Sequence, residues 1–236
     1  MKLTAEEKWM YRVMKAIYDS GIPISFKGSM VLKACLLEAG YFEETRHTVD
    51  IDANWNTKEF PTAEQMADSI RDALKKGGLE MGVSVLRTPE EGRSAGFELW
   101  EEATGDVLFS MDVDVNRPAA PTKIYEIEGL RFCGVTPAQM IADKVAAISS
   151  DRVFRRIKDV ADLYYLSKVV PFDGETTRKT LENSGRTLGD FHGFLCKTEE
   201  LKHSYDKFRF SGDAEKPPFE EVYCTAKSYI DAVLPE

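Results

Sequence analysis

The chain opens with apolar residues at helical spacing and continues with short strand-like runs. Trp9, Val13 and Ile17 recur about one turn apart before Gly21, which predicts a first helix. The middle of the chain then alternates apolar and polar residues in short runs bounded by turn residues, a pattern typical of strands. Runs of this kind cover residues 22–26, 49–55, 79–87, 96–101 and 107–115. Further helices are predicted at about residues 30–39 and between Thr62 and Gly77.

From Thr136 onwards the pattern becomes helical. Thr136 and Gln139 form a capping box, and helical periodicity then continues almost to Leu166. A closing helix is predicted at residues 219–234. The chain therefore changes from a mixture of strands and helices to helices alone.

This order of elements predicts an α+β (α/β) fold with two parts. Residues 1–133 form a core with a mixed sheet flanked by helices, and residues 134–236 form a helical C-terminal lobe. No apolar run approaches the roughly 18 residues that a membrane span needs. The N-terminus also lacks the apolar core of a signal peptide. We therefore expect a cytoplasmic protein without a membrane partner.

Charge and metal-binding side chains narrow the function further. A net charge of −9 argues against an extended basic surface for nucleic acid, so any such contact must be local. The cysteines and histidines lack the spacing of a zinc site or a disulfide framework. We expect the thiols of Cys35, Cys133, Cys196 and Cys224 to be buried and reduced. We expect His47, His192 and His203 to be structural or surface residues.

Two pairs of aspartates stand one residue apart on predicted strands. Asp50 and Asp52 share one face of their strand, and Asp112 and Asp114 repeat this arrangement. Paired carboxylates repel unless a cation or a proton neutralises them, and their oxygen atoms suit Mg²⁺ bound together with phosphates. If the two strands are neighbours, three or four carboxylates surround a site for two metal ions. For either pair alone, a solvated strand face is the alternative.

A Gly28-Ser29 turn lies between the first predicted strand and the helix that follows it. Glycine permits a close approach of the backbone, and the start of a helix presents free N–H groups and a positive dipole to a phosphate. The turn therefore has the features of a triphosphate-binding site. A plain strand-to-helix turn with Ser29 as the N-cap explains the same residues.

Basic residues accompany the helical half of the chain. Lys144 lies at the border of an apolar stripe, where its ammonium can reach a phosphate or extend to water. Arg152 follows two turns later on a similar side of the predicted helix. Four-residue spacing also allows ion pairs along a surface helix, between Arg155 and Asp159 and between Lys158 and Asp162.

Taken together, these motifs resemble the AbiEii/AbiGii family of bacterial toxin nucleotidyltransferases, a branch of the DNA polymerase β-type superfamily. The likeness covers roughly residues 26–166. Four segments match in chain order: Phe26–Ser29, Arg46–Asp52, Val113–Asn116, and Lys144 followed by Arg156–Tyr164. The resemblance implies a polymerase β-like nucleotidyltransferase core.

The resemblance also implies roles for single residues. Asp50, Asp52 and Asp114 would hold Mg²⁺, with Asp114 preferred to Asp112 because the residues that follow it resemble the end of the family's third acidic strand. Gly28 and Ser29 would bind the phosphates of an NTP, and Lys144 would steady the triphosphate. Arg152 and Asp159 would complete the nucleotide-binding set. Arg155 and Arg156, beside Lys144 and Arg152, supply a local basic cluster for an RNA acceptor.

The activity expected from the resemblance is Mg²⁺-dependent transfer of a nucleoside monophosphate from an NTP to an acceptor hydroxyl. Asp114 would help to deprotonate the hydroxyl, and pyrophosphate would leave. The acceptor implied is RNA, with a tRNA end as one form. The chain would be the toxin of a toxin–antitoxin or abortive-infection system with a cognate antitoxin protein. A catalytically silent nucleotide-binding or protein-interaction module is the alternative, and the lack of clustered histidines disfavours a metal-dependent phosphohydrolase.

Overall fold

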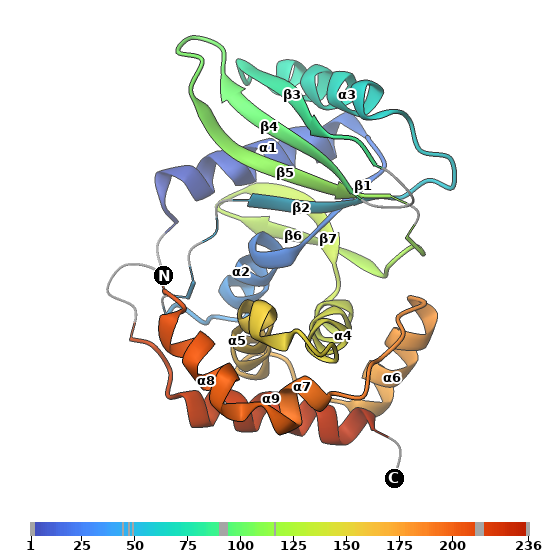
Figure 1. The fold of residues 1–236 in the computed structure, drawn as a ribbon. Helices are drawn as coiled ribbons and strands as arrows, with labels where there is room; N and C mark the ends of the chain where they lie inside the picture. The colour runs from blue at the N-terminus through green and yellow to red at the C-terminus, as the bar shows by residue number, and fades with distance from the viewer. Residues whose placement is uncertain are drawn as a thin grey trace. The chain divides into compact units, whose positions relative to one another are not determined.

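The computed structural model describes residues 3–43, 45–46, 48, 50–89, 94–115, 117–210 and 215–234, and the chain divides into two compact units (Figure 1). The sheet unit comprises Lys2–Ala34 and Thr48–Val135, and the helical unit comprises Cys35–His47 and Thr136–Glu236. The helical unit thus includes a segment from the first half of the chain, which a division between residues 133 and 134 does not foresee. Three motif residues, His47, Val49 and Asn116, lie outside the described residues.

Within the described residues, seven strands form one mixed sheet in the order β3-β4-β5-β2-β1-β7-β6. The β1/β7 and β2/β5 pairs are parallel, and the other neighbours are antiparallel. This mixed sheet confirms the predicted fold class. The strands are β1 (Ile24–Lys27), β2 (Asp50–Trp55), β3 (Met81–Arg87), β4 (Ser94–Glu101), β5 (Val107–Asp114), β6 (Thr122–Ile127) and β7 (Leu130–Val135).

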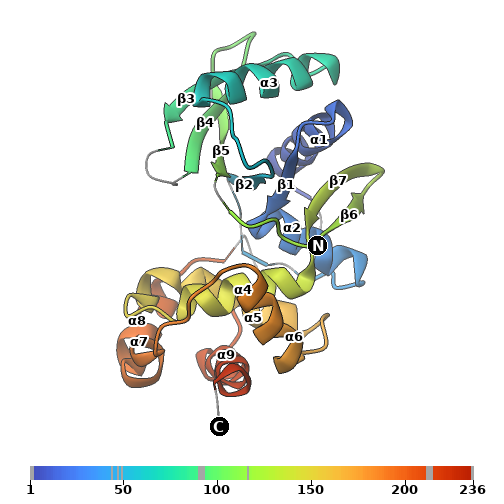
Figure 2. The ribbon, with the colours of Figure 1, turned by 90° about the vertical axis from the view of Figure 1, so that its right-hand side faces the viewer.

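Two helices cover one face of this sheet. The capping boxes Thr4/Glu7 and Thr62/Gln65 start α1 (Ala5–Ser20) and α3 (Ala63–Lys76), as the sequence predicts. Helix α1 packs against β7 and α3, and α3 packs against β3. Figure 2 shows both helices beside the strands that they cover. The third helix of the unit, α2 (Gly28–Glu38), begins directly after β1, and its last residues belong to the helical unit.

Alternation along the central strands separates an apolar face from an acidic one. Ile51, Met111 and Val113 are fully buried on one face. The aspartates between them are only partly buried and therefore project from the other face. Helices on the apolar face thus leave the acidic side chains of β2 and β5 together on the opposite side of the sheet.

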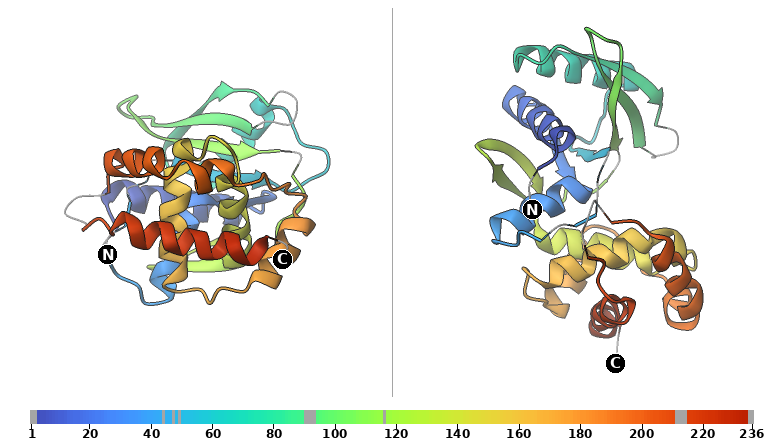
Figure 3. Two further views of the ribbon diagram at one scale, coloured as in Figure 1. Left: turned by 60° about the horizontal axis from the view of Figure 1, so that its bottom comes forward. Right: turned by 90° about the vertical axis from the view of Figure 1, so that its left-hand side faces the viewer.

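The helical unit packs around α5. Helix α5 contacts α4 and α9, and α4 contacts α6. Figure 3 shows α9, in red, running across α4 and α5. None of the described helices combines the length and the apolar character that a membrane span requires. The elements are α4 (Pro137–Ile148), the 3₁₀ helix η1 (Val153–Arg156), α5 (Ile157–Ser167), α6 (Gly174–Asn183), α7 (His192–Cys196), α8 (Thr198–Lys207) and α9 (Phe219–Val233).

The predicted continuous helix from Thr136 almost to Leu166 is wrong. Helix α4 ends at Ile148, and α5 begins at Ile157. The Ser149 and Ser150 hydroxyls donate hydrogen bonds to carbonyl groups three residues earlier, at 2.8 and 3.3 Å. Such bonds compete with the backbone hydrogen bonds of a helix and therefore favour the end of the helix.

The predictions for cysteines and histidines hold only in part. All four thiols are free, but Cys196 and Cys224 are exposed, so the expectation of burial is wrong for them and right for Cys35. His192 and His203 are exposed, as predicted for surface histidines. The prediction for His47 concerns a residue outside the described part of the chain.

Candidate active site

The acidic strands β2 and β5 are neighbours in the sheet. Their parallel register places Asp52 beside Asp112 and Asn54 beside Asp114. On its other side, Asp52 is the register partner of Lys27 at the end of β1. Because register partners share a face, the predicted carboxylates all project from the same side. The two acidic pairs therefore lie on one face of the sheet, on neighbouring strands.

Gly28 brings the start of α2 against this acidic face. Its φ angle is +71°, in the left-handed region that glycine adopts at little cost. A Cβ atom at this position would lie 2.2 Å from Oδ2 of Asp52. Both the backbone angle and the close approach therefore require glycine. The Asp52 carboxylate therefore lies against the first residue of α2.

A chain of hydroxyl groups connects the Gly-Ser turn to Asp50. The Ser29 hydroxyl forms a hydrogen bond with Thr48, and the Thr48 hydroxyl donates a hydrogen bond of 3.2 Å to Oδ1 of Asp50. Ser29 and Thr48 are both buried. The turn and the first aspartate are thus positioned together. Sequence reasoning assigned no role to Thr48, although it lies in the segment that carries the resemblance.

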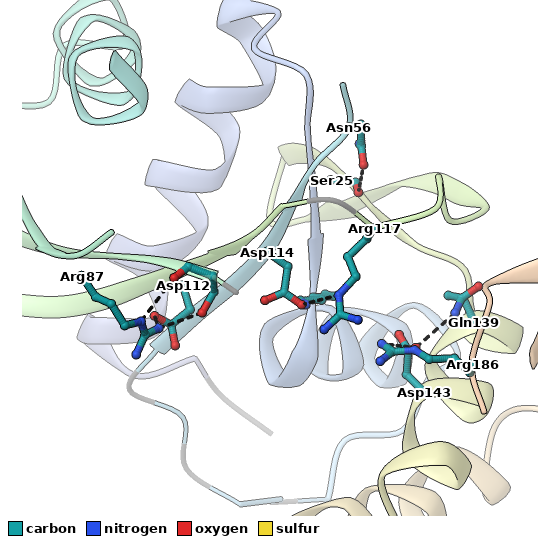
Figure 4. Close-up of polar contacts among 11 residues, drawn as sticks. Ser25, Asn56, Arg87, Asp112, Asp114, Arg117, Gln139, Asp143 and Arg186 are labelled. Atoms are coloured by element: carbon teal, nitrogen blue, oxygen red, sulfur yellow. Dashed lines mark hydrogen bonds and ion pairs between the residues drawn. The ribbon is translucent and has the colours of Figure 1, made fainter. Parts of the chain in front are cut away.

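Asp114 is bound by two basic side chains. Lys27 Nζ donates a hydrogen bond of 2.7 Å to Oδ2, and Arg117 Nε donates one of 3.3 Å to the same oxygen. Figure 4 shows Arg117 directed toward Asp114. Burial alone would raise the pKa of Asp114, but the Lys27 ammonium and the Arg117 guanidinium outweigh it and hold the pKa below its usual value. Asp114 is therefore an ionised carboxylate with a cation already beside it.

Asp112 has a different environment. Arg87 at the end of β3 donates hydrogen bonds from Nη2 to Oδ1 of Asp112, at 2.9 Å, and to the Ser94 hydroxyl, at 2.8 Å (Figure 4). The side chains of Arg87 and Asp112 are 53% and 50% exposed, whereas that of Asp114 is 22% exposed. Of the two aspartates on β5, Asp114 is thus the less exposed one.

The donor atoms suit a hard divalent cation. Mg²⁺ commonly uses one or two protein carboxylates and completes its shell with water and substrate phosphates. Asp50 and Asp52, beside the start of α2 at Gly28, fit that chemistry. No three carboxylate, thiol or imidazole groups of the described residues lie close enough to hold one ion together. Asp114 as a third ligand therefore stays a prediction.

The other predicted residues belong to a buried ion network in the helical unit. Lys144 Nζ lies 2.7 Å from Oδ1 of Asp159 and 2.6 Å from Oδ2 of Asp162. Arg46 donates two hydrogen bonds to Asp162, of 2.8 and 3.0 Å. Oδ2 of Asp159 is buried and accepts no hydrogen bond from the described residues. Lys144 therefore binds two carboxylates and does not extend to water.

This network corrects one interpretation of the sequence. Asp159 and Asp162 are 5% and 0% exposed, so they are not the acidic halves of surface pairs with Arg155 and Lys158. Burial alone would raise the pKa of Asp162, but Arg46 and Lys144 hold it well below its usual value. The same two carboxylates outweigh the burial of Lys144 and raise its pKa. Four-residue spacing within a helix does not predict the actual partners of Asp162, which are Arg46 and Lys144 and lie far away in the sequence.

Arg152 lies outside this network. It precedes η1 and is exposed, as are Arg155 and Arg156. None of the three forms an ion pair with a carboxylate of the described residues. The expected position of Arg152 two turns along the Lys144 helix is wrong, because α4 ends before it.

Comparison with known proteins identifies the group to which this arrangement belongs. The fold is similar to that of MenT4, a nucleotidyltransferase toxin from Mycobacterium tuberculosis H37Rv, with a TM-score of 0.57 and 15% sequence identity over 97% of this chain and 82% of the other. At that identity the likeness concerns the fold alone. A search for similar curated proteins found no match. A family model described as nucleotidyl transferase AbiEii toxin of type IV toxin–antitoxin systems matches residues 12–223. This match covers most of the sequence, and the chain therefore belongs to the AbiEii family of nucleotidyltransferase toxins.

Proposed function

We propose that the chain transfers a nucleoside monophosphate from an NTP to an acceptor hydroxyl with the help of Mg²⁺. Asp50 and Asp52 would hold the ion with Asp114 as a third ligand, and Gly28 and Ser29 would bind the phosphates. The observation that carries this proposal is the contact between Gly28 and Asp52. It joins a helix start, which favours phosphate, to a carboxylate pair, which favours a cation, without space for a side chain between them.

The proposed site residues of the sheet unit each have a role in the transfer. The backbone N–H groups at the start of α2 would donate hydrogen bonds to the phosphate oxygens. The bound ion would neutralise the phosphates and activate the attacking oxygen. Asp114 accepts a hydrogen bond from the acceptor hydroxyl and takes its proton as the oxygen attacks the α-phosphorus. Pyrophosphate leaves as the new bond forms. Thr48 keeps Asp50 and Ser29 in place through its hydroxyl group.

Lys144 and Asp159 are proposed to contribute to nucleotide binding. The support is the family resemblance, together with one oxygen of Asp159 that is buried without a partner among the described residues. A buried oxygen without a hydrogen bond destabilises the fold, so this oxygen suits a donor group on a ligand. Lys144 would have to exchange one of its two carboxylates for a phosphate, and its main task in the unbound chain is structural.

RNA is the proposed acceptor, with a tRNA end as one form. The basic segment Arg152, Arg155 and Arg156 is exposed and supplies local positive charge on a chain with a net charge of −9. Because the family belongs to type IV toxin–antitoxin systems, a cognate antitoxin protein is a further proposed partner.

Labelled nucleotide tests the proposal directly. The purified chain would be incubated with each α-labelled NTP, Mg²⁺ and total cellular RNA, and transfer to RNA or protein would be measured. We expect Asp52→Asn to lower transfer by about a hundredfold or more, because a metal contributes several kcal/mol of charge stabilisation. Circular dichroism would verify that the variant is folded.

Asp112→Asn is the matched control, since Asp112 lies beside Asp52 on the same face but is bound by Arg87. Transfer by this variant should stay close to that of the wild type. Equal transfer by the wild type and Asp52→Asn would refute the proposal. Nucleotide binding without transfer in the wild type would favour a silent binding module.

A further inference from the structure

Lys27 occupies a particular place on the acidic face. It is the last residue of β1, it precedes Gly28, and its register partner on β2 is Asp52. Its side chain nevertheless reaches past β2, because its Nζ atom lies 2.7 Å from Oδ2 of Asp114 on β5. The Lys27 and Asp114 side chains are only 18% and 22% exposed. The ion pair is thus partly shielded from water and crosses the proposed site.

The charges on this face explain why a cation lies there. Asp50, Asp52, Asp112 and Asp114 project from neighbouring strands, and carboxylates at such spacing repel one another. Arg87 neutralises Asp112 at the exposed edge. Lys27 is the cation that spans the centre of the face, since it starts beside Asp52 and ends on Asp114.

The Lys27–Asp114 ion pair also affects whether Asp114 can bind a metal ion. While the Lys27 ammonium binds Oδ2 of Asp114 at 2.7 Å, a divalent cation that approached this oxygen would be repelled by the ammonium charge. Lysine can leave without disturbing the backbone, since its charge stands at the end of a flexible four-carbon stem.

We propose that Lys27 is a built-in counter-cation of Asp114, which holds this carboxylate until a divalent cation displaces the ammonium. The inference rests on the proposed function and adds a positioning residue to it. Lys27 keeps the acidic face assembled without metal and weakens metal binding by competition. Arg117, which also contacts Oδ2 of Asp114 but is 45% exposed, remains as a partner of the carboxylate after the exchange.

Titration with Mn²⁺ in the absence of nucleotide, followed by electron paramagnetic resonance, tests this competition. We expect Lys27→Met to bind Mn²⁺ about fivefold more tightly than the wild type, since it lacks an ion pair worth about 1 kcal/mol. Lys27→Arg retains the positive charge and should keep the weaker affinity of the wild type. Arg87→Met is the matched control, because it removes a cation from the half-exposed Asp112 on the same face, where water screens the charge, and it should raise the affinity by less than Lys27→Met does.

A double variant separates competition from a structural effect. In the Asp114→Asn background there is no carboxylate for Lys27 to occupy, so adding Lys27→Met should not raise Mn²⁺ affinity. If Lys27→Met fails to fold, Lys27→Gln takes its place in both comparisons. Melting temperatures give a second measure: Mn²⁺ should stabilise Lys27→Met by more degrees than it stabilises the wild type.

The outcomes distinguish this inference from the proposed function. Equal or weaker Mn²⁺ binding by folded Lys27→Met, with nucleotide transfer intact in the wild type, overturns the role of Lys27 alone. A gain in affinity that persists in the Asp114→Asn background also overturns it. If neither the wild type nor Lys27→Met binds Mn²⁺, with or without an NTP, both the inference and the metal-dependent function fail.

Discussion

At the scale of single residues, Gly28 best connects local backbone geometry to the proposed chemistry. Its positive φ allows the chain to turn from β1 directly into α2, and its missing side chain leaves space for the Asp52 carboxylate. A phosphate and a cation can then meet at one place. Gly28 has two roles, as a turn residue with positive φ and as the residue that leaves space for Asp52, and these two roles need separate tests.

Gly28→Ala and Gly21→Ala provide that separation. Both residues have a positive φ, but a Cβ atom at Gly21 meets nothing within 4 Å. Each substitution should lower the free energy of unfolding by about 1–2 kcal/mol through backbone strain, measured by urea denaturation. Only Gly28→Ala should also lower nucleotide transfer, by at least about tenfold, because it displaces Asp52. Normal transfer by folded Gly28→Ala would contradict the proposed role of the turn.

The sequence predicts the acidic side chains of the site better than their partners. Asp50 and Asp52 follow from strand alternation and from a motif that is local in the chain. Lys27 and Asp114 are 87 residues apart, and Arg46 and Asp162 are 116 residues apart. No spacing rule connects such residues, because the fold alone brings them together. Helical spacing therefore predicts a surface pair for Asp162, whereas the fold buries it.

At the scale of elements, the Arg46–Asp162–Lys144 network ties α4, α5 and the segment after α2 into one unit. Lys144 comes from α4, Asp162 comes from α5, and Arg46 comes from the segment Cys35–His47. The Asp162 carboxylate has both oxygens bonded and is fully buried. Removing one member of such a network leaves a buried charge without its partner, which is costly.

Asp162→Asn should lower the free energy of unfolding by about 3–5 kcal/mol at neutral pH. The pKa of Asp162 is lowered by folding, so its contribution is present above its unfolded pKa of about 4 and is lost as the pH falls further. The stability difference between the wild type and the variant should therefore shrink in acid. Urea denaturation at several pH values measures it. Asp231→Asn, in an exposed pair with Lys227, should have little effect at any pH; a similar loss in both variants would contradict the account.

Periodicity predicts the elements with a clear alternation or apolar stripe well and the elements without one poorly. The helices α1, α3 and α9 and the strands β2 and β5 agree with their predicted ranges within a few residues. The alternation of apolar and polar residues does not predict the β6/β7 hairpin, because β6 buries only Tyr125 and Ile127. The hairpin turn has positive φ angles at Glu128 and Gly129, a short signal that a single glycine does not reveal.

At the scale of the whole molecule, charge decides how an acceptor can bind. A net charge of −9 repels a nucleic-acid backbone in general, so an RNA acceptor needs a local positive surface. The exposed residues Arg152, Arg155 and Arg156 are the proposed surface. Their position in and next to a 3₁₀ helix, outside the buried ion network, leaves them available for such a contact.

Replacing these three arginines with glutamine should weaken RNA binding and leave Mn²⁺ binding unchanged. Each phosphate contact with a single strand contributes about 0.7 to the slope of log affinity against log salt concentration, so the slope should fall by up to about 2. Fluorescence anisotropy with labelled RNA at several salt concentrations measures it. An unchanged slope would show that the RNA contacts another surface or that RNA is not the acceptor.

The most direct test of the central claim counts Mn²⁺ ions bound to the chain in the presence of a non-hydrolysable NTP analogue. Electron paramagnetic resonance would compare the wild type with the double variant Asp50→Asn/Asp52→Asn, after circular dichroism has shown that both are folded. If these carboxylates hold the ion together with the phosphates, the wild type binds Mn²⁺ tightly only with the analogue, and the double variant loses this binding. Equal binding of Mn²⁺ by both proteins would contradict the assignment of the site.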